Sequence, residues 1–315
     1  YDRGNPGQET SFGNSGVISP SAVVPIAMPG LMSSIPNWLF QSDGPLAIDW
    51  SSLPTYLPWL LQFLSNSREL PARHNSKALQ LLNTECLEIL IPLLKEADSE
   101  LLIENKGMLY VYQSDKEFQQ GQLSREFRKA NSTGAYDISR GALQDIEPNL
   151  STNFVRGTFF PEAAHSINPY RLVKCLADYF VQSGGRFEHE EIVKISENRQ
   201  GKALLETTRR SIQSDICVIA AGVWSRQLLK GLGYHIPLIS HRGYHVTVEN
   251  PGVKLNTVLC PVSYMATIVP MEMGIRIGGT VELSRMNKPP NLQRTDALLE
   301  KLKITVPKID TKQHT

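Results

Sequence analysis

Residues 215–225 read DICVIAAGVWS, an unbroken apolar run that ends in small residues. Consecutive apolar residues are typical of a parallel strand that is buried on both faces. Ala220, Ala221 and Gly222 would let a bulky ligand approach the backbone closely. The alternative interpretation is a tight strand-to-helix turn without a ligand. The stretch therefore predicts an α/β core. It predicts a ligand site as well if the small residues serve the approach of a ligand.

The residues before this run predict a helix and further strands. The segment 168–185, NPYRLVKCLADYFVQSGG, has Asn168 as its N-cap, Pro169 in its first turn and a Gly-Gly stop. A strand-helix-strand alternation then continues through RFEHEEIVKISE (186–197), ALLETT (203–208) and SDICVIAAG (214–222). Because parallel strands need helical crossovers, this alternation predicts parallel strands.

The sequence after Pro237 predicts a second, antiparallel sheet, since its apolar residues alternate with a period of two. The strands expected there are GYHVTVE (243–249), ATIVP (266–270) and GIRIGGTVEL (274–283). Helices are expected at 56–67, 76–97, 114–131 and 292–303, and strands at 107–112 and 154–160. Residues 1–55 read as loops around a ligand, and the polar tail 306–315 as disordered.

Composition narrows the class of protein. The chain has 315 residues, 41% of them hydrophobic, which is enough for one large domain or two interleaved domains. Its net charge of +1 gives no field that would attract nucleic acid, so no nucleic-acid partner is expected. The four cysteines share no CxxC spacing and read as reduced, packed thiols, so no metal site is expected. No apolar run is long enough to span a bilayer, and the expected location is cytoplasmic.

Two polar motifs carry open alternatives. Asp2 sits where a dinucleotide-binding fold places the acid that binds the adenosine ribose, or it is an ordinary terminal residue. In HRGYH (241–245), strand alternation directs Arg242 and Tyr244 to one face and His245 to the other. These side chains serve a site, or they are partly exposed strand residues. Hydrolase, zinc-protease and P-loop motifs are absent from the sequence.

Five stretches, read in order, resemble the D-amino-acid oxidase superfamily of FAD-dependent oxidoreductases, and most closely the small subunit of bacterial D-amino-acid dehydrogenase. They are YDRGNPGQETSFGNSGVISPSAVVPIAMPG, HSINPYRLVKCLA, DICVIAAGVWSRQLLKGLG, RGYHVTVE and SYMATIVPMEMGIRIGGTVEL. The resemblance covers nearly the whole chain. It implies an FAD-binding, Rossmann-like domain interleaved with an antiparallel-sheet substrate domain.

The resemblance also implies the cofactor contacts. Asp2 corresponds to the ribose-binding acid and Arg3 to its neighbour at the adenosine. The family's T-S-x-x-N-x-G segment runs beside the pyrophosphate and the flavin, and its residues here are Thr10, Ser11, Asn14, Ser15 and Gly16. Val193 falls where a main-chain contact to adenine is usual. Ala220, Ala221, Gly222 and Trp224 match the turn that packs on the cofactor, so the 10–16 loop and the 220–222 turn are expected to converge on one slot.

For the substrate side, the resemblance implies that Tyr244 and Tyr264 wall the cavity above the flavin as catalytic residues. Arg242 and Thr267 are the expected substrate-binding residues. Thr267 occupies a position where some oxidase relatives have tyrosine, which argues against a strict glycine oxidase. In the implied reaction a hydride leaves the substrate's α-carbon for flavin N5, and the imine is hydrolysed to a 2-oxo acid, largely through positioning.

The domain division expected from the resemblance assigns 1–50 and 150–235 to the FAD-binding domain, and 51–149 and 236–305 to the substrate domain. The family's G-x-G-x-x-G turn would precede Tyr1 and its G-x-R-P motif would follow Thr315, so weak or no FAD retention and little turnover are expected.

Three functions remain open at this stage. The first is a D-amino-acid dehydrogenase that passes electrons to a quinone or another carrier. The second is an oxidase of glycine, sarcosine or hydroxyproline, and the third is an inactive remnant of the family. The apolar stretch YLPWLLQFL (56–64) either rests on the inner face of the cell membrane or forms a core helix.

Overall fold

The computed structural model describes residues 1–31, 44, 46–286 and 288–315, and its largest element is a mixed sheet. The eight strands of this sheet are β2 (Leu46–Ile48), β4 (Met108–Tyr112), β5 (Tyr136–Ser139), β6 (Arg156–Phe160), β11 (Arg242–Val248), β12 (Val258–Pro261), β13 (Ala266–Met271) and β14 (Gly274–Leu283). Their order is β11-β14-β13-β12-β4-β6-β5, and β2 pairs with β14. The pairs β12–β4 and β14–β2 are parallel and the others antiparallel.

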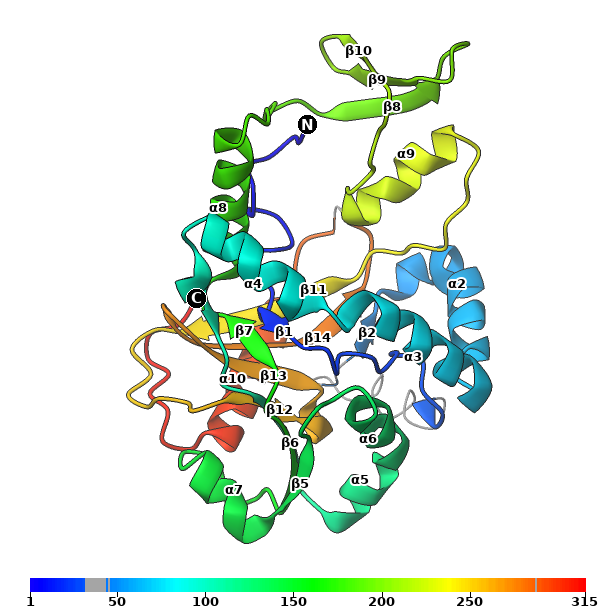
Figure 1. The fold of residues 1–315 in the computed structure, drawn as a ribbon. Coiled ribbons are helices and arrows are strands. Elements are labelled where there is room, and N and C mark those ends of the chain that lie inside the picture. The colour runs from blue at the N-terminus through cyan, green and yellow to red at the C-terminus, as the bar shows by residue number, and fades with distance from the viewer. Residues whose placement is uncertain (32–43, 45, 287) are drawn as a thin grey trace.

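Two smaller antiparallel sheets accompany it (Figure 1). One contains β1 (Val17–Ile18), β7 (Ala164–Ser166) and β3 (Ile103–Glu104), and the other contains β10 (Ser211–Ser214), β9 (Ala203–Thr207) and β8 (Ile192–Glu197). Together with the helices, these sheets confirm the predicted mixed α/β class.

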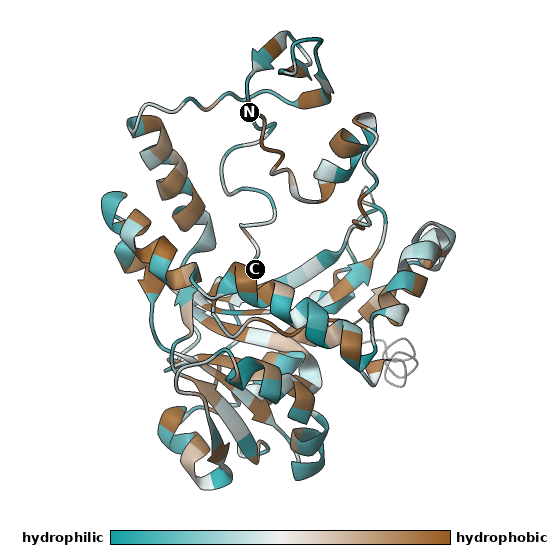
Figure 2. Ribbon diagram, turned by 45° about the vertical axis from the view of Figure 1, so that its right-hand side comes forward, coloured by the Kyte–Doolittle hydropathy of each residue, from teal (hydrophilic) through white to brown (hydrophobic). Residues whose placement is uncertain are grey.

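The helices carry both hydrophobic (brown) and hydrophilic (teal) residues in Figure 2. They are α2 (Leu53–Ser65), α3 (Glu69–Asn83), α4 (Cys86–Glu96), α5 (Asp115–Gln120), α6 (Gln122–Lys129), α7 (Arg140–Ile146), α8 (Pro169–Gln182), α9 (Ser225–Gly231) and α10 (Gln293–Thr305). Single 3-10 turns occupy Trp50–Ser52, Glu100–Leu102, Gly222–Trp224 and Val262–Tyr264. None of the helices in the described ranges is both long and apolar enough to cross a membrane.

The large sheet has two different faces, because successive side chains of a strand point to opposite sides. One face carries the largest hydrophobic cluster, in which Leu109, Ile268 and Ile277 pack with Leu298 and Leu302 of α10. The other face carries a second cluster of Met108, Cys260, Val269 and their neighbours, with Val17 of β1 packed against it. The second face is the one that the 10–16 loop crosses.

The helix over 168–185 forms as predicted. The Asn168 side chain accepts a hydrogen bond from the Arg171 N–H at 3.0 Å, Pro169 is the first helical residue, and Gly184 follows the end with φ of +95°. The predicted helix over 76–97 is instead divided between α3 and α4. In α2, Tyr56 is buried while Leu57 and Leu61 are exposed.

The predicted parallel alternation through 186–222 is wrong. The loops 198–202 and 208–210 join β8, β9 and β10 as hairpins, because a parallel connection needs about a dozen residues or more. Residues 215–221 form no strand, and Ile216 and Val218 are 80% and 83% exposed. No strand of the described residues pairs with this apolar run, so it is not the buried parallel strand that its composition predicts.

The predicted disorder of 306–315 is also wrong. Thr315 and Thr247 exchange two backbone hydrogen bonds of 2.8 and 2.9 Å, and the Glu249 N–H donates to the Gln313 carbonyl at 3.0 Å. Val306 is fully buried. Strand β11 lies at a sheet edge, so its outer backbone N–H and C=O groups are free to pair with another segment. This pairing does not depend on the side chains of that segment. The tail therefore pairs through its backbone, which its polar composition does not reveal.

Candidate functional site

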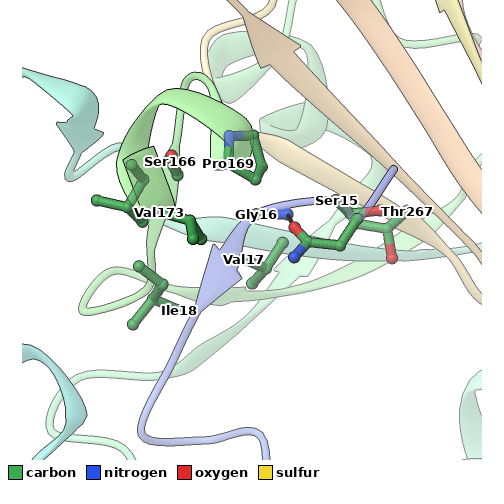
Figure 3. Close-up of a pocket in the computed structure, with 10 residues that line it drawn as sticks. Ser15, Gly16, Val17, Ile18, Ser166, Pro169, Val173 and Thr267 are labelled. Carbon is green, nitrogen blue, oxygen red and sulfur yellow. Dashed lines mark hydrogen bonds between the residues drawn. The ribbon is translucent and has the colours of Figure 1, made fainter. Parts of the chain in front are cut away.

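A pocket of about 340 Å³ lies between the 14–18 segment, the start of α8 and strand β13 (Figure 3). This volume falls at the lower end of the roughly 300–1,000 Å³ range of small-molecule sites. Its lining combines backbone and hydroxyl donors with an apolar wall. The lining residues are Asn14, Ser15, Gly16, Val17, Ile18, Ser166, Pro169, Leu172, Val173 and Thr267.

The loop that forms one wall of the pocket is fixed by its own backbone. The Asn14 Oδ1 accepts a hydrogen bond from the Gly16 N–H at 2.7 Å, and the Ser166 N–H donates to the Gly16 carbonyl at 2.8 Å. Gly16 has φ of +66°, and a Cβ built there would lie 2.7 Å from the Ser166 carbonyl oxygen. The sequence needs glycine here both for the left-handed conformation and for the close approach.

Arg276 of β14 holds the same loop from the side of the large sheet. Its Nη1 donates to the carbonyls of Phe12 and Asn14 at 2.9 and 3.0 Å, and its Nε donates to the Thr247 hydroxyl at 3.0 Å. Arg276 is only 4% exposed, and burial lowers the pKa of its guanidinium. No motif in the sequence predicts Arg276 as part of the site. A charged residue inside the apolar strand GIRIGG is the signal that was available.

Two glycines allow the loop to touch the sheet. A Cβ at Gly278 would lie 2.5 Å from the Ser15 hydroxyl, and a Cβ at Gly13 would lie 2.6 Å from the His245 ring. His245 therefore points toward the loop. This agrees with the predicted alternation, because Arg242 and Tyr244 point to the opposite face, where the Tyr244 hydroxyl meets Glu282.

The half-buried His245 makes the stability of the fold depend on pH. Burial, followed by the charge of Arg276, lowers the pKa of His245 below its ordinary 6.5. The unfolded chain then binds a proton that the folded protein does not, so stability is expected to fall as the pH falls from 6.5 toward the lowered pKa. Urea unfolding between pH 5 and 7.5 should show a shallower loss of stability in His245→Gln than in wild type. Some loss should remain, because burial also lowers the pKa of His165 and His241.

The exposed His74→Gln is the control. If it made the loss of stability shallower by the same amount, His245 would not be the cause of the pH dependence.

The N-terminal residues contact a different part of the molecule. The Asp2 N–H donates to the Glu188 carbonyl at 3.1 Å, and its carboxylate accepts from the Gly4 N–H at 2.9 Å. The Arg3 guanidinium lies 4.3 Å from the ring centroid of Trp224. This contact joins the 1–16 segment to the 222–224 turn. Thr10 is exposed and Ser11 half-buried in the turns that follow.

The other predicted cofactor residues lie outside the pocket. Val193 sits at a bulge of β8, opposite no residue of β9, which leaves its main chain outside the regular ladder. Gly222 has φ of +54°, and a Cβ there would meet nothing within 4 Å. Ala220, Ala221 and Gly222 do not line the pocket that Asn14, Ser15 and Gly16 form. Their convergence on one slot stays a prediction.

Of the predicted substrate and catalytic residues, Thr267 alone lines this pocket. The Tyr264 hydroxyl accepts a hydrogen bond from the Gln113 side chain at 2.7 Å, and Gln113 lines a separate cavity of about 530 Å³. Tyr244 is buried on the α10 side of the sheet, and Arg242 donates to the carbonyls of Met286 and Lys288. The structure therefore does not bring these four residues together.

Tyr244→Phe is expected to lower the free energy of unfolding by about 1–3 kcal/mol, because it leaves buried partners without a hydrogen bond. The Tyr244 hydroxyl donates to Glu282 and accepts from the Asn291 N–H at 2.9 Å. Burial raises the pKa of Tyr244, as does the bond to Glu282. Urea unfolding measures the loss, with the 64% exposed Tyr234→Phe as the control. Unchanged stability with lost turnover would instead support the predicted catalytic role.

Comparisons with known proteins agree with one another. Residues 1–314 match the DAO family, described as FAD dependent oxidoreductase. A D-amino-acid oxidase of Bradyrhizobium diazoefficiens is 31% identical over 313 residues, which cover 98% of this chain and 74% of the relative. Glycine oxidase from Geobacillus kaustophilus superposes with a TM-score of 0.68 at 16% identity, covering 99% of this chain and 73% of that one. L-alpha-glycerophosphate oxidase from Mycoplasma pneumoniae, with FAD bound, gives 0.64 at 18% identity, covering 98% and 71%.

Proposed function

Because the chain belongs to the DAO family of FAD-dependent oxidoreductases, we propose that it oxidises the carbon–nitrogen bond of a D-amino acid. The observation that carries the proposal is the 31% identity to a D-amino-acid oxidase along 98% of the chain. The pocket between the 14–18 segment and Thr267 supports it, since it has the size and the mixed lining of a small-molecule site.

The pocket residues fit the ring end of FAD. Val17, Ile18, Leu172 and Val173 supply an apolar wall, and the 14–16 backbone and the Ser15 hydroxyl supply donors. We propose that this loop holds the ring. For the remaining cofactor contacts we propose the positions assigned from the sequence, namely Asp2, Arg3, Thr10, Ser11, Val193, Ala220, Ala221, Gly222 and Trp224. The Val193 bulge and the open space at Gly222 support a main-chain contact at each.

The reaction removes two electrons from the substrate. The α C–H bond breaks, the amine loses a proton, and a C=N bond forms. Water then adds to the imine, giving a 2-oxo acid and ammonium. When bound, FAD supplies the acceptor for the hydride. This chain's residues bind and orient the amino acid, and we propose that Thr267 does so at the pocket. Tyr244, Tyr264 and Arg242, the further residues assigned from the sequence, lie outside this pocket.

Two versions of this function differ in the molecule that accepts the electrons from the reduced flavin. In the first, the enzyme is a dehydrogenase that passes electrons to a quinone or another carrier, with α2 resting on a membrane surface. The exposed Leu57 and Leu61 of α2 support that contact. In the second, it is an oxidase that passes electrons to oxygen, with a D-amino acid, glycine, sarcosine or hydroxyproline as substrate. The name of the Bradyrhizobium relative favours the second version.

Anaerobic mixing tests the proposed function. The FAD-loaded protein is mixed with a panel of D-amino acids and their L-enantiomers, with glycine and sarcosine as further samples. We expect the flavin absorbance to bleach with at least one D-amino acid and not with its enantiomer, with 2-oxo acid and ammonium formed in equal amounts. Admitting air and measuring peroxide then separates oxidase from dehydrogenase. Bleaching with glycine or sarcosine alone, or with no compound of the panel, would contradict D-amino-acid specificity.

A further inference from the structure

Thr267 lines the pocket from the middle of the large sheet (Figure 3). On one side, Gly278 of β14 pairs with Thr267, and a Cβ at Gly278 would lie 2.5 Å from the Ser15 hydroxyl. On the other side, the antiparallel register of β12 with β13 sets Cys260 opposite Thr267. Because side chains at paired positions share a face, Thr267 lies between the Ser15 loop and Cys260.

Cys260 is a buried thiol that hydrogen-bonds to Thr267. The residue is 6% exposed and belongs to the apolar cluster that includes Met108, Phe160 and Val258. Burial raises the pKa of the Cys260 thiol to about 12, and the hydrogen bond with the Thr267 side chain opposes this rise. A bond that opposes the rise is one in which the hydroxyl donates to the sulfur. The thiol is neutral at pH 7, and its sulfur acts as the acceptor.

This bond decides which hydrogen-bonding groups Thr267 presents to the pocket. A threonine hydroxyl has one hydrogen and two acceptor lone pairs. When the hydrogen is directed to Cys260, the lone pairs remain for a ligand that enters the pocket. Rotation about χ1 is restricted in a β-branched side chain, so the bond to the sulfur also fixes where these lone pairs point. Thr267 is therefore prepared to accept a hydrogen bond from a ligand that carries an N–H group.

A neutral amine is such a ligand, and its orientation matters for the proposed reaction. It has two N–H groups and one lone pair, and this lone pair forms the new C=N bond as the α-hydrogen leaves. An acceptor for one N–H group limits rotation about the C–N bond and so directs the lone pair. Two other side-chain oxygens that line the pocket, those of Asn14 and Ser166, already accept backbone N–H groups at 2.7 and 3.3 Å.

We infer that Cys260 is a positioning residue: its sulfur accepts a hydrogen bond from the Thr267 hydroxyl, so that Thr267 accepts a hydrogen bond from the amino group of the substrate. The inference rests on the proposed function for its substrate class. Cys260 acts through Thr267 and does not itself contact the ligand. A cysteine that the sequence predicts only as a packed thiol thereby affects which ligands the pocket prefers.

Two ligands of nearly equal shape test the acceptor without turnover. Pyrrole-2-carboxylate carries a ring N–H group where furan-2-carboxylate carries a ring oxygen. Calorimetry measures the dissociation constant (Kd) of each ligand with the FAD-loaded protein. We expect wild type to bind the pyrrole compound about 3- to 10-fold more tightly, the factor that corresponds to one net hydrogen bond. Thr267→Val should bind both ligands equally, because valine has no hydroxyl.

The same assay tests Cys260. Cys260→Ala leaves the Thr267 hydroxyl free to turn, so the preference for the pyrrole compound should fall below about twofold. Cys260→Ser keeps a hydrogen-bonding side chain and should restore part of the preference. In the Thr267→Val background, Cys260→Ala should change neither Kd, because the two residues act as one unit. For the best D-amino acid, kcat/KM should fall about 3- to 10-fold in Cys260→Ala.

Val258→Ala is the matched control for the lost volume. Val258 is 1% exposed, belongs to the same apolar cluster and lies two residues before Cys260, on the same face of β12. Its truncation should lower stability in urea unfolding and leave the preference between the two ligands unchanged. Cys260→Val, which keeps volume without a hydrogen-bonding group, replaces Cys260→Ala if that variant does not fold.

The outcomes separate this inference from the proposed function. An unchanged preference in Cys260→Ala or Cys260→Val would overturn the inference, as would an equal loss of preference in Val258→Ala. A wild type that binds neither ligand, or binds both equally, would overturn it as well. If wild type turns over no D-amino acid, the proposed function fails, and the two titrations still decide whether Cys260 sets Thr267 as an acceptor.

Discussion

Arg276→Met should weaken FAD binding by about tenfold or more and lower the free energy of unfolding by about 2–4 kcal/mol. The guanidinium satisfies the Phe12 and Asn14 carbonyls and the Thr247 hydroxyl in a nearly closed environment. Each buried polar group left without a partner costs about 1–3 kcal/mol, partly offset because the variant no longer buries a charge. Methionine fills a similar volume, so the loss would report the hydrogen bonds rather than a cavity.

Flavin fluorescence titration and urea unfolding measure the two effects of Arg276→Met separately. The control is Arg140→Met, since the Arg140 side chain makes a hydrogen bond to the Thr152 carbonyl in an exposed position. It should change stability by no more than about 0.5 kcal/mol. If Arg276→Met lost stability but kept FAD affinity, the 12–14 loop would not be part of the cofactor site.

Gly16→Ala is the second change with a large expected effect. Alanine at φ of +66° is strained, and its Cβ would lie 2.7 Å from the Ser166 carbonyl oxygen and 3.1 Å from Pro169 Cγ. Ser166 ends β7 and Pro169 begins α8, and both are held by regular backbone pairing, so the loop must move instead. We expect a loss of about 1–3 kcal/mol in unfolding free energy and at least about tenfold in FAD affinity.

Gly141→Ala is the matched control for Gly16→Ala. Gly141 lies within helix α7, and a Cβ there would meet nothing within 4 Å. Alanine is the better helix former, so this variant should gain roughly 0.5–1 kcal/mol with unchanged FAD affinity. Retention of wild-type FAD affinity by Gly16→Ala would show that the loop conformation is not needed for the cofactor.

Local sequence patterns predicted the elements that local interactions determine. Helix α8 carries its cap, its proline and its glycine stop within one segment, and β11, β13 and β14 show a clear two-residue period. The 215–221 run was misread because composition reports that side chains are apolar but not which strands lie beside them. The prediction of disorder for 306–315 is wrong because this tail pairs with β11 through backbone groups, which its polar composition does not reveal.

The candidate site was predictable only in part. The resemblance singled out Asn14, Ser15, Gly16 and Thr267, and these four residues line the pocket, whereas Thr10 and Ser11 do not. It did not identify Arg276, because the contacts of this residue arise from pairing between segments that are distant in the chain. Tyr244 and Arg242 have the side chains that a substrate site needs, but their strand face turns them toward α10 and the 284–291 segment.

The contacts of Arg276 also bear on the order of folding. Arg276 lies 264 positions after Phe12 and 262 positions after Asn14 in the chain. A contact between such distant residues forms only after other interactions have offset the entropy lost in closing the loop between them. The 12–14 loop therefore lacks its contacts with Arg276 until β14 has joined the sheet. Cofactor capture is then a late event that follows chain collapse, and flavin added during refolding should leave the early kinetic phases unaltered.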